Sequence, residues 1–236
     1  MNYYNYVNFQ KEINKNSRTS LINNWKVTEG ISKKVDSKGY YLEFIGNTTL
    51  IFLNSKEIAM VRKIQQQLYS QIGELLATPL NPDTFHVTIH DLCNPYTSKD
   101  VYSCMTNTEE KIKKLFNSTL KKYINITIKL ESIGLFNGNS AIGIQFIPST
   151  KKDFDSLIDT YNIIDTVFPL NSTLIPHVTL GYYKPINYSI EERKRIVKAI
   201  EDIKSNISLN LFIKNLSLQK FFSMNEYKEV FTLMNL

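Results

Sequence analysis

The sequence has few of the residues that stabilise a fold without a large core. Its two cysteines, Cys93 and Cys104, share no C-x-x-C spacing, so we expect no disulfide framework and a reducing compartment. Together with only three histidines they form no recognisable zinc-ligand set, and we expect no metal and no cofactor. No apolar run approaches the ~20 residues of a membrane span. The polar N-terminus also lacks the apolar stretch of a secretory signal, which predicts a cytoplasmic protein with no membrane partner.

What the sequence does contain is typical of an ordinary globular protein. Of its 236 residues 42% are hydrophobic and 21% are charged, which is enough for a sizeable core in one large domain or in two lobes. The net charge of +6 favours a polyanionic partner. No block of five like charges occurs, so charge alone does not distinguish a nucleic-acid ligand from a bias in composition.

The chain divides by pattern into an extension and a main body. Residues 1–40 are rich in Asn, Lys and Ser, with a helix expected around residues 9–25 and a turn at residues 36–39. Two interpretations remain open for this segment, an extension laid against the main body or a mobile tail. Residues 41–236 are more regular, and we expect them to form a single domain with two lobes.

The main body contains two copies of a strand–helix–strand unit, at about residues 43–92 and 139–183. Such a repeat predicts two lobes related by a pseudo-twofold axis, each with an antiparallel sheet and outer helices, in an α+β fold. Hydrophobic periodicity gives the individual elements. The expected strands are 43–53, 84–92, 124–136, 140–147, 174–183, 208–222 and 229–234, and the expected helices are 56–76, 108–120, 151–167 and 190–203.

The second strand of each repeat carries the sequence H-V-T, beginning at His86 and at His177. Side chains of a strand alternate between its two faces, so each histidine shares a face with the threonine two residues later, Thr88 or Thr179. A single such match is weak evidence, and a structural histidine at a sheet edge would explain it. The same motif at equivalent points of a repeat favours a functional interpretation.

Paired histidines suit the cleavage of a phosphodiester. In-line displacement needs a base for the attacking oxygen and an acid for the leaving oxygen, on opposite sides of phosphorus, and imidazoles can serve in both roles near neutral pH. Threonine hydroxyls can donate to the non-bridging oxygens, where negative charge develops. We therefore predict His86 and His177 as catalytic residues, and Thr88 and Thr179 as substrate-binding residues, without a metal.

On these two motifs the sequence resembles the 2H phosphoesterase superfamily, which is named for paired H-x-[ST]-x motifs. The resemblance covers roughly residues 30–235, and residues 30–48 also resemble one uncharacterised subgroup of that superfamily. It implies a bilobal α+β fold, with both motifs lining a central cleft. The activity that it implies is hydrolysis or transesterification of 2′,3′-cyclic, 1″,2″-cyclic or 2′–5′ phosphodiester bonds.

Other residues near the motifs are weaker candidates for the cleft. His90 is expected on the face of His86, where it could contact a base or phosphate or lie at the rim with no role. Tyr183 is expected beside His177 if the strand stays regular, where it could stack on a base, whereas Tyr182 should point the other way unless Gly181 bends the strand. Further candidates are more readily explained as turn or surface residues; they are Asn47, Thr48, Lys33, Lys34 and Lys184.

The prediction is a monomeric, metal-independent phosphodiesterase acting on a 2′,3′-cyclic phosphate, a cyclic nucleotide or a 2′–5′ linked oligonucleotide. Two alternatives belong to other classes. One is an RNA- or nucleotide-binding module without turnover. The other is a scaffold protein that uses residues 1–40 for docking. The loops around the cleft choose the substrate, and the motifs alone do not name it.

Overall fold

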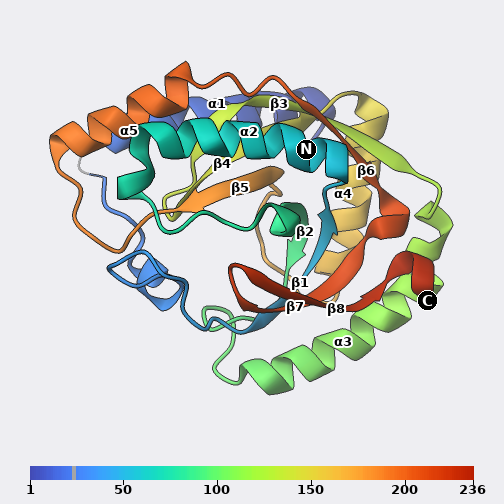
Figure 1. Cartoon of the computed structure of the whole chain (residues 1–236). Coiled ribbons are helices and arrows are strands. Elements are labelled where there is room, and N and C mark those ends of the chain that lie inside the picture. The colour runs from blue at the N-terminus through green and yellow to red at the C-terminus, as the bar shows by residue number, and fades with distance from the viewer. Residues whose placement is uncertain (23–24) are drawn as a thin grey trace.

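The computed structural model describes residues 1–22 and 25–236, and Figure 1 shows its arrangement. Residues 23 and 24, which fall within the helix expected at 9–25, lie outside the described part. The helices are α1 (Tyr3–Ile22), α2 (Ser55–Ile72), α3 (Val101–Ser118), α4 (Lys151–Asp165) and α5 (Ile190–Asp202). The strands are β1 (Gly46–Phe52), β2 (His86–Asp91), β3 (Thr127–Asn137), β4 (Ala141–Pro148), β5 (His177–Tyr182), β6 (Ser208–Phe212), β7 (Ser217–Ser223) and β8 (Glu226–Thr232).

The strands form two four-stranded antiparallel sheets, with the orders β2-β1-β7-β8 and β5-β4-β3-β6. The helices lie on the outside, so the predicted α+β class is confirmed. Each of the two repeated units contributes a strand pair, β1 with β2 and β4 with β5, connected by α2 and α4 respectively. Strands β2 and β5 are the inner edges of their sheets and lie close to each other.

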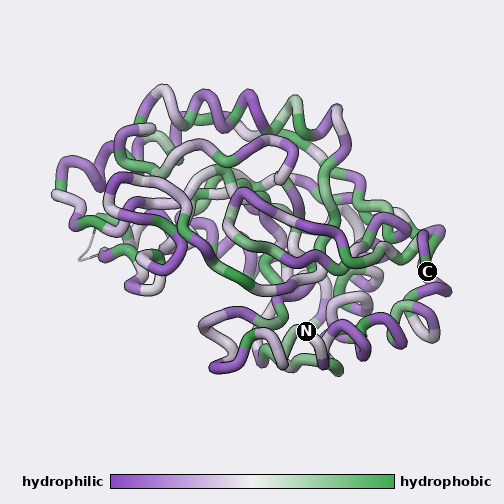
Figure 2. Tube along the Cα trace, turned by 60° about the horizontal axis from the view of Figure 1, so that its bottom comes forward, coloured by the Kyte–Doolittle hydropathy of each residue, from purple (hydrophilic) through white to green (hydrophobic). Residues whose placement is uncertain are grey.

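The helices of both repeats begin at strong N-caps and bury one face. Asn54 caps α2 in a capping box with Glu57, and Thr150 caps α4 by accepting a hydrogen bond from the backbone of Asp153. Figure 2 shows hydrophilic and hydrophobic segments alternating along the outer helices. This is the pattern of helices that bury one face and expose the other. No helix in the described part of the chain is both long and apolar enough to cross a bilayer.

The expected strand at residues 208–222 is wrong, because this segment forms two strands in different sheets. A turn of 3₁₀-helix at Ile213–Asn215 separates β6, which pairs with β3, from β7, which pairs with β1. The apolar pattern continues across the break, since Ile213 and Leu216 are buried in the core that the two sheets share. Periodicity therefore did not reveal the point at which the chain changes sheets.

A disulfide joins Cys93 and Cys104, contrary to the expectation from cysteine spacing. Helix α3 starts at Val101, earlier than predicted, because the Asp100 side chain caps it. This early start places Cys104 in the first turns of the helix, with its Cα 5.9 Å from that of Cys93 just after β2. The expectation of a reducing compartment rested on the cysteines, and this disulfide removes that support.

Helix α1 packs against the main body through buried polar side chains. The Tyr6 hydroxyl and the Gln10 amide both donate to the carbonyl oxygen of Leu174, at 2.8 and 2.9 Å. The buried Gln145 of β4 donates to the Gln10 side chain at 2.7 Å and accepts from Asn14 at 3.2 Å. The described part of the extension is therefore laid against the main body, and it supports the segment that leads into β5.

Candidate functional site

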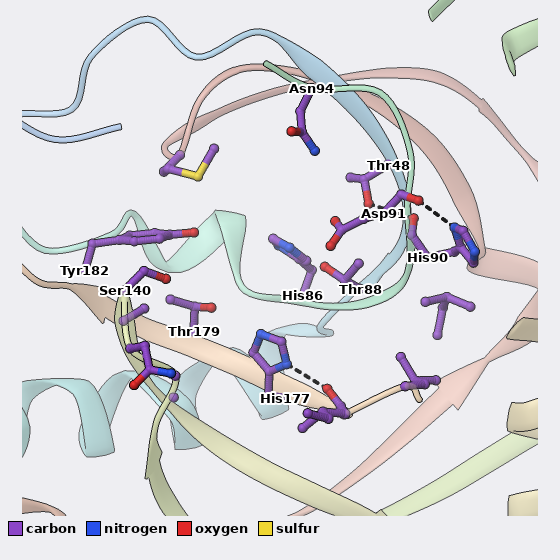
Figure 3. A pocket seen from close by; sticks show the side chains of 18 of the residues that line it. Thr48, His86, Thr88, His90, Asp91, Asn94, Ser140, His177, Thr179 and Tyr182 are labelled. Atoms are coloured by element: carbon purple, nitrogen blue, oxygen red, sulfur yellow. Dashed lines mark hydrogen bonds between the residues drawn. The ribbon is translucent and has the colours of Figure 1, made fainter. Parts of the chain in front are cut away.

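The two motif strands line opposite sides of one cavity of about 620 Å³. Residues of β2 and β5 can be matched by their pairing with β1 and β4. His86 lies opposite Phe52 of β1, and His177 lies opposite Gln145, the corresponding position of β4. Figure 3 shows both imidazoles pointing into the cavity, with one threonine hydroxyl near each of them. The side chains that the sequence analysis paired are thus brought together from separate repeats.

Both histidines are held by the same hydrogen bond. Nδ1 of His86 donates to the carbonyl oxygen of Thr84 at 2.6 Å, and Nδ1 of His177 donates to that of Ile175 at 2.7 Å. In each case the acceptor is two residues before the histidine. A proton fixed on Nδ1 leaves the Nε2 lone pair of a neutral imidazole for a ligand. Each ring can therefore accept or return a proton at Nε2.

The surroundings of His86 favour its neutral form. Burial is the main cause that lowers the pKa of His86 to about 4; the hydrogen bond to the Thr84 carbonyl opposes the decrease, and the nearby His177 adds to it. Two aromatic rings are among its neighbours, since Phe52 and Tyr227 lie edge-on to the imidazole with centroids 5.8 and 5.1 Å away. A neutral imidazole with a free Nε2 is the form that a general base requires.

The two motif threonines are available to a ligand. Thr88 and Thr179 are half-buried and line the cavity. Neither hydroxyl has a hydrogen-bond partner in the protein within the described residues, whereas Thr48 and Thr49 of β1 do. Thr48, for example, donates to the carbonyl oxygen of His90 at 3.0 Å. Hydroxyls without partners beside two imidazoles can donate to an anion in the cavity.

His90 does not lie on the face of His86, so that expectation is wrong. A β-bulge occurs where Ile89 has no partner in β1, and it reverses the alternation of β2. The His90 side chain is fully buried, with Nε2 2.9 Å from a carboxylate oxygen of Asp165 and Nδ1 2.6 Å from the carbonyl oxygen of Asp91. It joins β2 to the end of α4 and forms part of the cavity wall with both ring nitrogens bound, and the bulge places Asp91 on the face of His86.

Strand β5 has a bulge at the equivalent point, and the expected sides of its two tyrosines are wrong. Leu180 has no partner in β4, so Tyr182 lies on the face of His177 and lines the cavity. Tyr183 is completely buried on the opposite side, with its ring centroid 4.9 Å from that of Trp25. The sequence signal for this exchange was Gly181, which permits the bend but does not show where it occurs.

The remaining candidates divide between structural and cavity positions. Asn47 is buried, where it donates to Thr108 at 2.9 Å and accepts from the backbone of Cys93 at 3.0 Å. Lys184 donates to the carbonyl oxygen of Glu74 outside the cavity. Lys34 lines the cavity, whereas Lys33 does not.

Sequence reasoning missed several side chains of the cavity wall. They come from loops, from β8 and from the end of β2, and no motif links them to the histidines. The most prominent are Asp91, Asn94, Tyr96, Ser140 and Tyr227. Within the described residues no group of three or more histidine, cysteine or acidic side chains could hold a metal ion.

The chain is similar to known proteins in its fold. No family model matches the sequence, and no curated protein matches it. A conserved protein of unknown function from Agrobacterium tumefaciens is similar in structure over 91% of this chain and 97% of that chain, with 14% identity and a TM-score of 0.67. Escherichia coli LigT in complex with phosphate aligns over 80% of this chain and 96% of that chain, with 15% identity and a TM-score of 0.49. The complex of LigT with 3′-AMP gives 16% identity over 80% and 97%, with a TM-score of 0.47.

The architecture agrees with the resemblance drawn from the motifs. The chain has a bilobal α+β fold, which it shares with the Agrobacterium protein, with one H-x-T motif on the inner strand of each sheet and both motifs facing the same cavity.

Proposed function

We propose that this protein is a metal-independent phosphodiesterase that acts through His86 and His177. The observation that carries the proposal is the pair of imidazoles facing one cavity from opposite strands, each with its Nδ1 proton held by a backbone carbonyl. This arrangement presents two Nε2 atoms to a ligand. It suits in-line displacement at phosphorus, where one group takes a proton while another gives one.

In the proposed reaction His86 is the base, because its burial favours the neutral form. Its Nε2 takes the proton of the attacking water or hydroxyl as the new P–O bond forms. His177 gives a proton from Nε2 to the leaving oxygen as the old P–O bond breaks. The hydroxyls of Thr88 and Thr179 donate to the non-bridging oxygens. The two histidines exchange protonation states in the step, so the reverse reaction would use them in the opposite roles.

The substrate class follows from the family resemblance and from the dimensions of the cavity. A cavity of about 620 Å³ accommodates a nucleotide or a short oligonucleotide end, since small-molecule sites commonly span about 300 to 1,000 Å³. The proposed substrates are a 2′,3′-cyclic phosphate, a cyclic nucleotide or a 2′–5′ linked oligonucleotide.

Turnover of these substrates in EDTA tests the proposal. We expect His86→Ala and His177→Ala each to lower kcat/KM by about 10²- to 10⁴-fold, because each removes one proton-transfer group. His90→Gln is a control for the loss of an imidazole, since His90 belongs to the cavity wall but its side chain is fully buried and both of its ring nitrogens are bound within the protein. Activity that disappears with the chelator and returns with added metal would contradict the proposal.

The alternative of a binding module without turnover makes a different prediction. It would show tight nucleotide binding, no product, and affinity that survives both His→Ala changes. The partnerless threonine hydroxyls are compatible with either function. The two identical Nδ1 hydrogen bonds favour catalysis, because binding alone does not require two rings of the same tautomer.

A further inference from the structure

The proposed catalytic groups are nearly symmetric, whereas a nucleotide is not. His86 with Thr88 and His177 with Thr179 occupy equivalent positions of the two repeats, so they give no reason for the nucleoside to lie at one side of the phosphate. A preferred orientation must come from positions at which the repeats differ. The repeats differ at Asp91 and Tyr182, the residues that follow Thr88 and Thr179 on the cavity-facing sides of β2 and β5.

Asp91 and Tyr182 are equivalent by register and different in chemistry. Asp91 lies opposite Thr48 of β1, and Tyr182 lies opposite Ala141, the corresponding residue of β4. The two bulges described above turn both side chains toward the cavity. Figure 3 shows the Tyr182 ring extending into it from one wall, while the Asp91 carboxylate and the Asn94 amide point in from the facing side. One repeat thus supplies an aromatic platform and the other an acceptor.

A third side chain, Lys34, completes this end of the cavity. Its ammonium lies over the rings of Phe44, Tyr96 and Tyr182, at 4.8, 5.5 and 5.6 Å from their centroids. Burial lowers the pKa of Lys34, and the charge of Asp91 opposes that decrease. Within the described residues, neither Lys34 nor the Asp91 carboxylate forms a salt bridge. Both groups line the cavity and are available to a ligand.

We propose that Tyr182, Asp91 and Lys34 form a base-reading site that places the nucleoside at this end of the cleft and prefers guanine. The Tyr182 ring offers a stacking surface for the base. Guanine alone among the common bases presents two adjacent N–H donors, N1–H and N2–H, on its pairing edge, and a carboxylate can accept both. Its neighbouring O6 is an acceptor, which suits the Lys34 ammonium. This site deepens the proposed function and rests on it.

Steady-state kinetics with the 2′,3′-cyclic phosphates of guanosine, adenosine, cytidine and uridine test the site. We expect the wild-type protein to prefer guanosine by at least about fivefold in kcat/KM, the lower end of what a bidentate contact contributes. Asp91→Asn should abolish that preference, because an amide offers only one acceptor oxygen. Asp83→Asn is the matched control, since it removes the same charge from an exposed position outside the cavity, and it should keep the preference.

Two outcomes would overturn the base-reading site: equal turnover of the four substrates by the wild-type protein, or a guanosine preference that survives Asp91→Asn. Binding measurements separate this site from the proposed function. If no substrate is cleaved, calorimetry with 5′-GMP and 5′-AMP still tests base reading. Tighter binding of GMP that is lost in Asp91→Asn would support the site even though the proposed activity had failed, and equal affinities in the wild-type protein would refute it.

Discussion

Replacing His86 by glutamine should change how the stability of the protein depends on pH. In the folded protein burial lowers the pKa of His86 from 6.5 to about 4. The unfolded chain binds a proton at this residue as the pH falls below 6.5, while the folded protein binds it only near pH 4. Protonation of the unfolded state therefore lowers the free energy of unfolding as the pH falls from 6.5 towards 4. Above pH 6.5 His86 is neutral in both states, and this loss of stability is absent.

The size of the effect follows from the shift. One pKa unit corresponds to about 1.4 kcal/mol, so the free energy of unfolding should fall by about 2 kcal/mol at pH 5 and by about 3 kcal/mol at pH 4 through His86 alone. The His86→Gln variant lacks this contribution. Its amide can still donate to the Thr84 carbonyl, which makes glutamine a conservative replacement.

Urea titrations of both proteins at pH 7.5, 6 and 5, followed by circular dichroism, measure the difference. Titrating groups common to the two proteins cancel when their unfolding free energies are subtracted. We expect the advantage of the wild-type protein over His86→Gln to be about 2 kcal/mol smaller at pH 5 than at pH 7.5. An advantage that stays constant over this range would show that His86 titrates normally, and it would remove the physical reason for assigning His86 as the base.

Two other changes test the supports of the site. Reducing the Cys93–Cys104 bond should lower the free energy of unfolding by about 2 to 4 kcal/mol, because it releases a closed loop of the unfolded chain; a urea midpoint that does not move with dithiothreitol would contradict this. Gln145→Ala should cost about 1 to 3 kcal/mol, because it leaves the buried polar groups of Gln10 without their partner, whereas Tyr6→Phe should cost less, since Gln10 still donates to the same carbonyl. If Gln145→Ala and Tyr6→Phe lose the same free energy of unfolding in thermal or urea titrations, the contacts of Gln145 stabilise the fold no more than the Tyr6 hydrogen bond does.

The sequence was most informative where structure repeats a local pattern. The strand–helix–strand units and the H-x-T motifs depend on alternation and helical periodicity, and both are properties of neighbouring residues along the chain. The strands that carry His86 and His177 and the orientation of these side chains could therefore be predicted. That the strands face each other required only the further assumption of a pseudo-twofold axis.

The rest depended on contacts between distant segments. The bulges at Ile89 and Leu180 arise from pairing with β1 and β4, and they decide that Asp91 and Tyr182, rather than His90 and Tyr183, share the faces of His86 and His177. One unpaired residue is enough to exchange the faces of a strand. The exact point of such a bulge is not visible in a single sequence. The same is true of Lys34, which reaches the cleft from a segment far along the chain from either motif.

The strands that carry the two histidines also leave one backbone edge without a strand partner, since β2 and β5 end their sheets on the inner side. Such edges favour strand addition by another molecule, and natural proteins shield them. Here they lie close to each other within the fold, so the arrangement that creates the cleft also shields these two edges. A substitution that separates the lobes would expose both edges at once, and loss of solubility should accompany loss of the site.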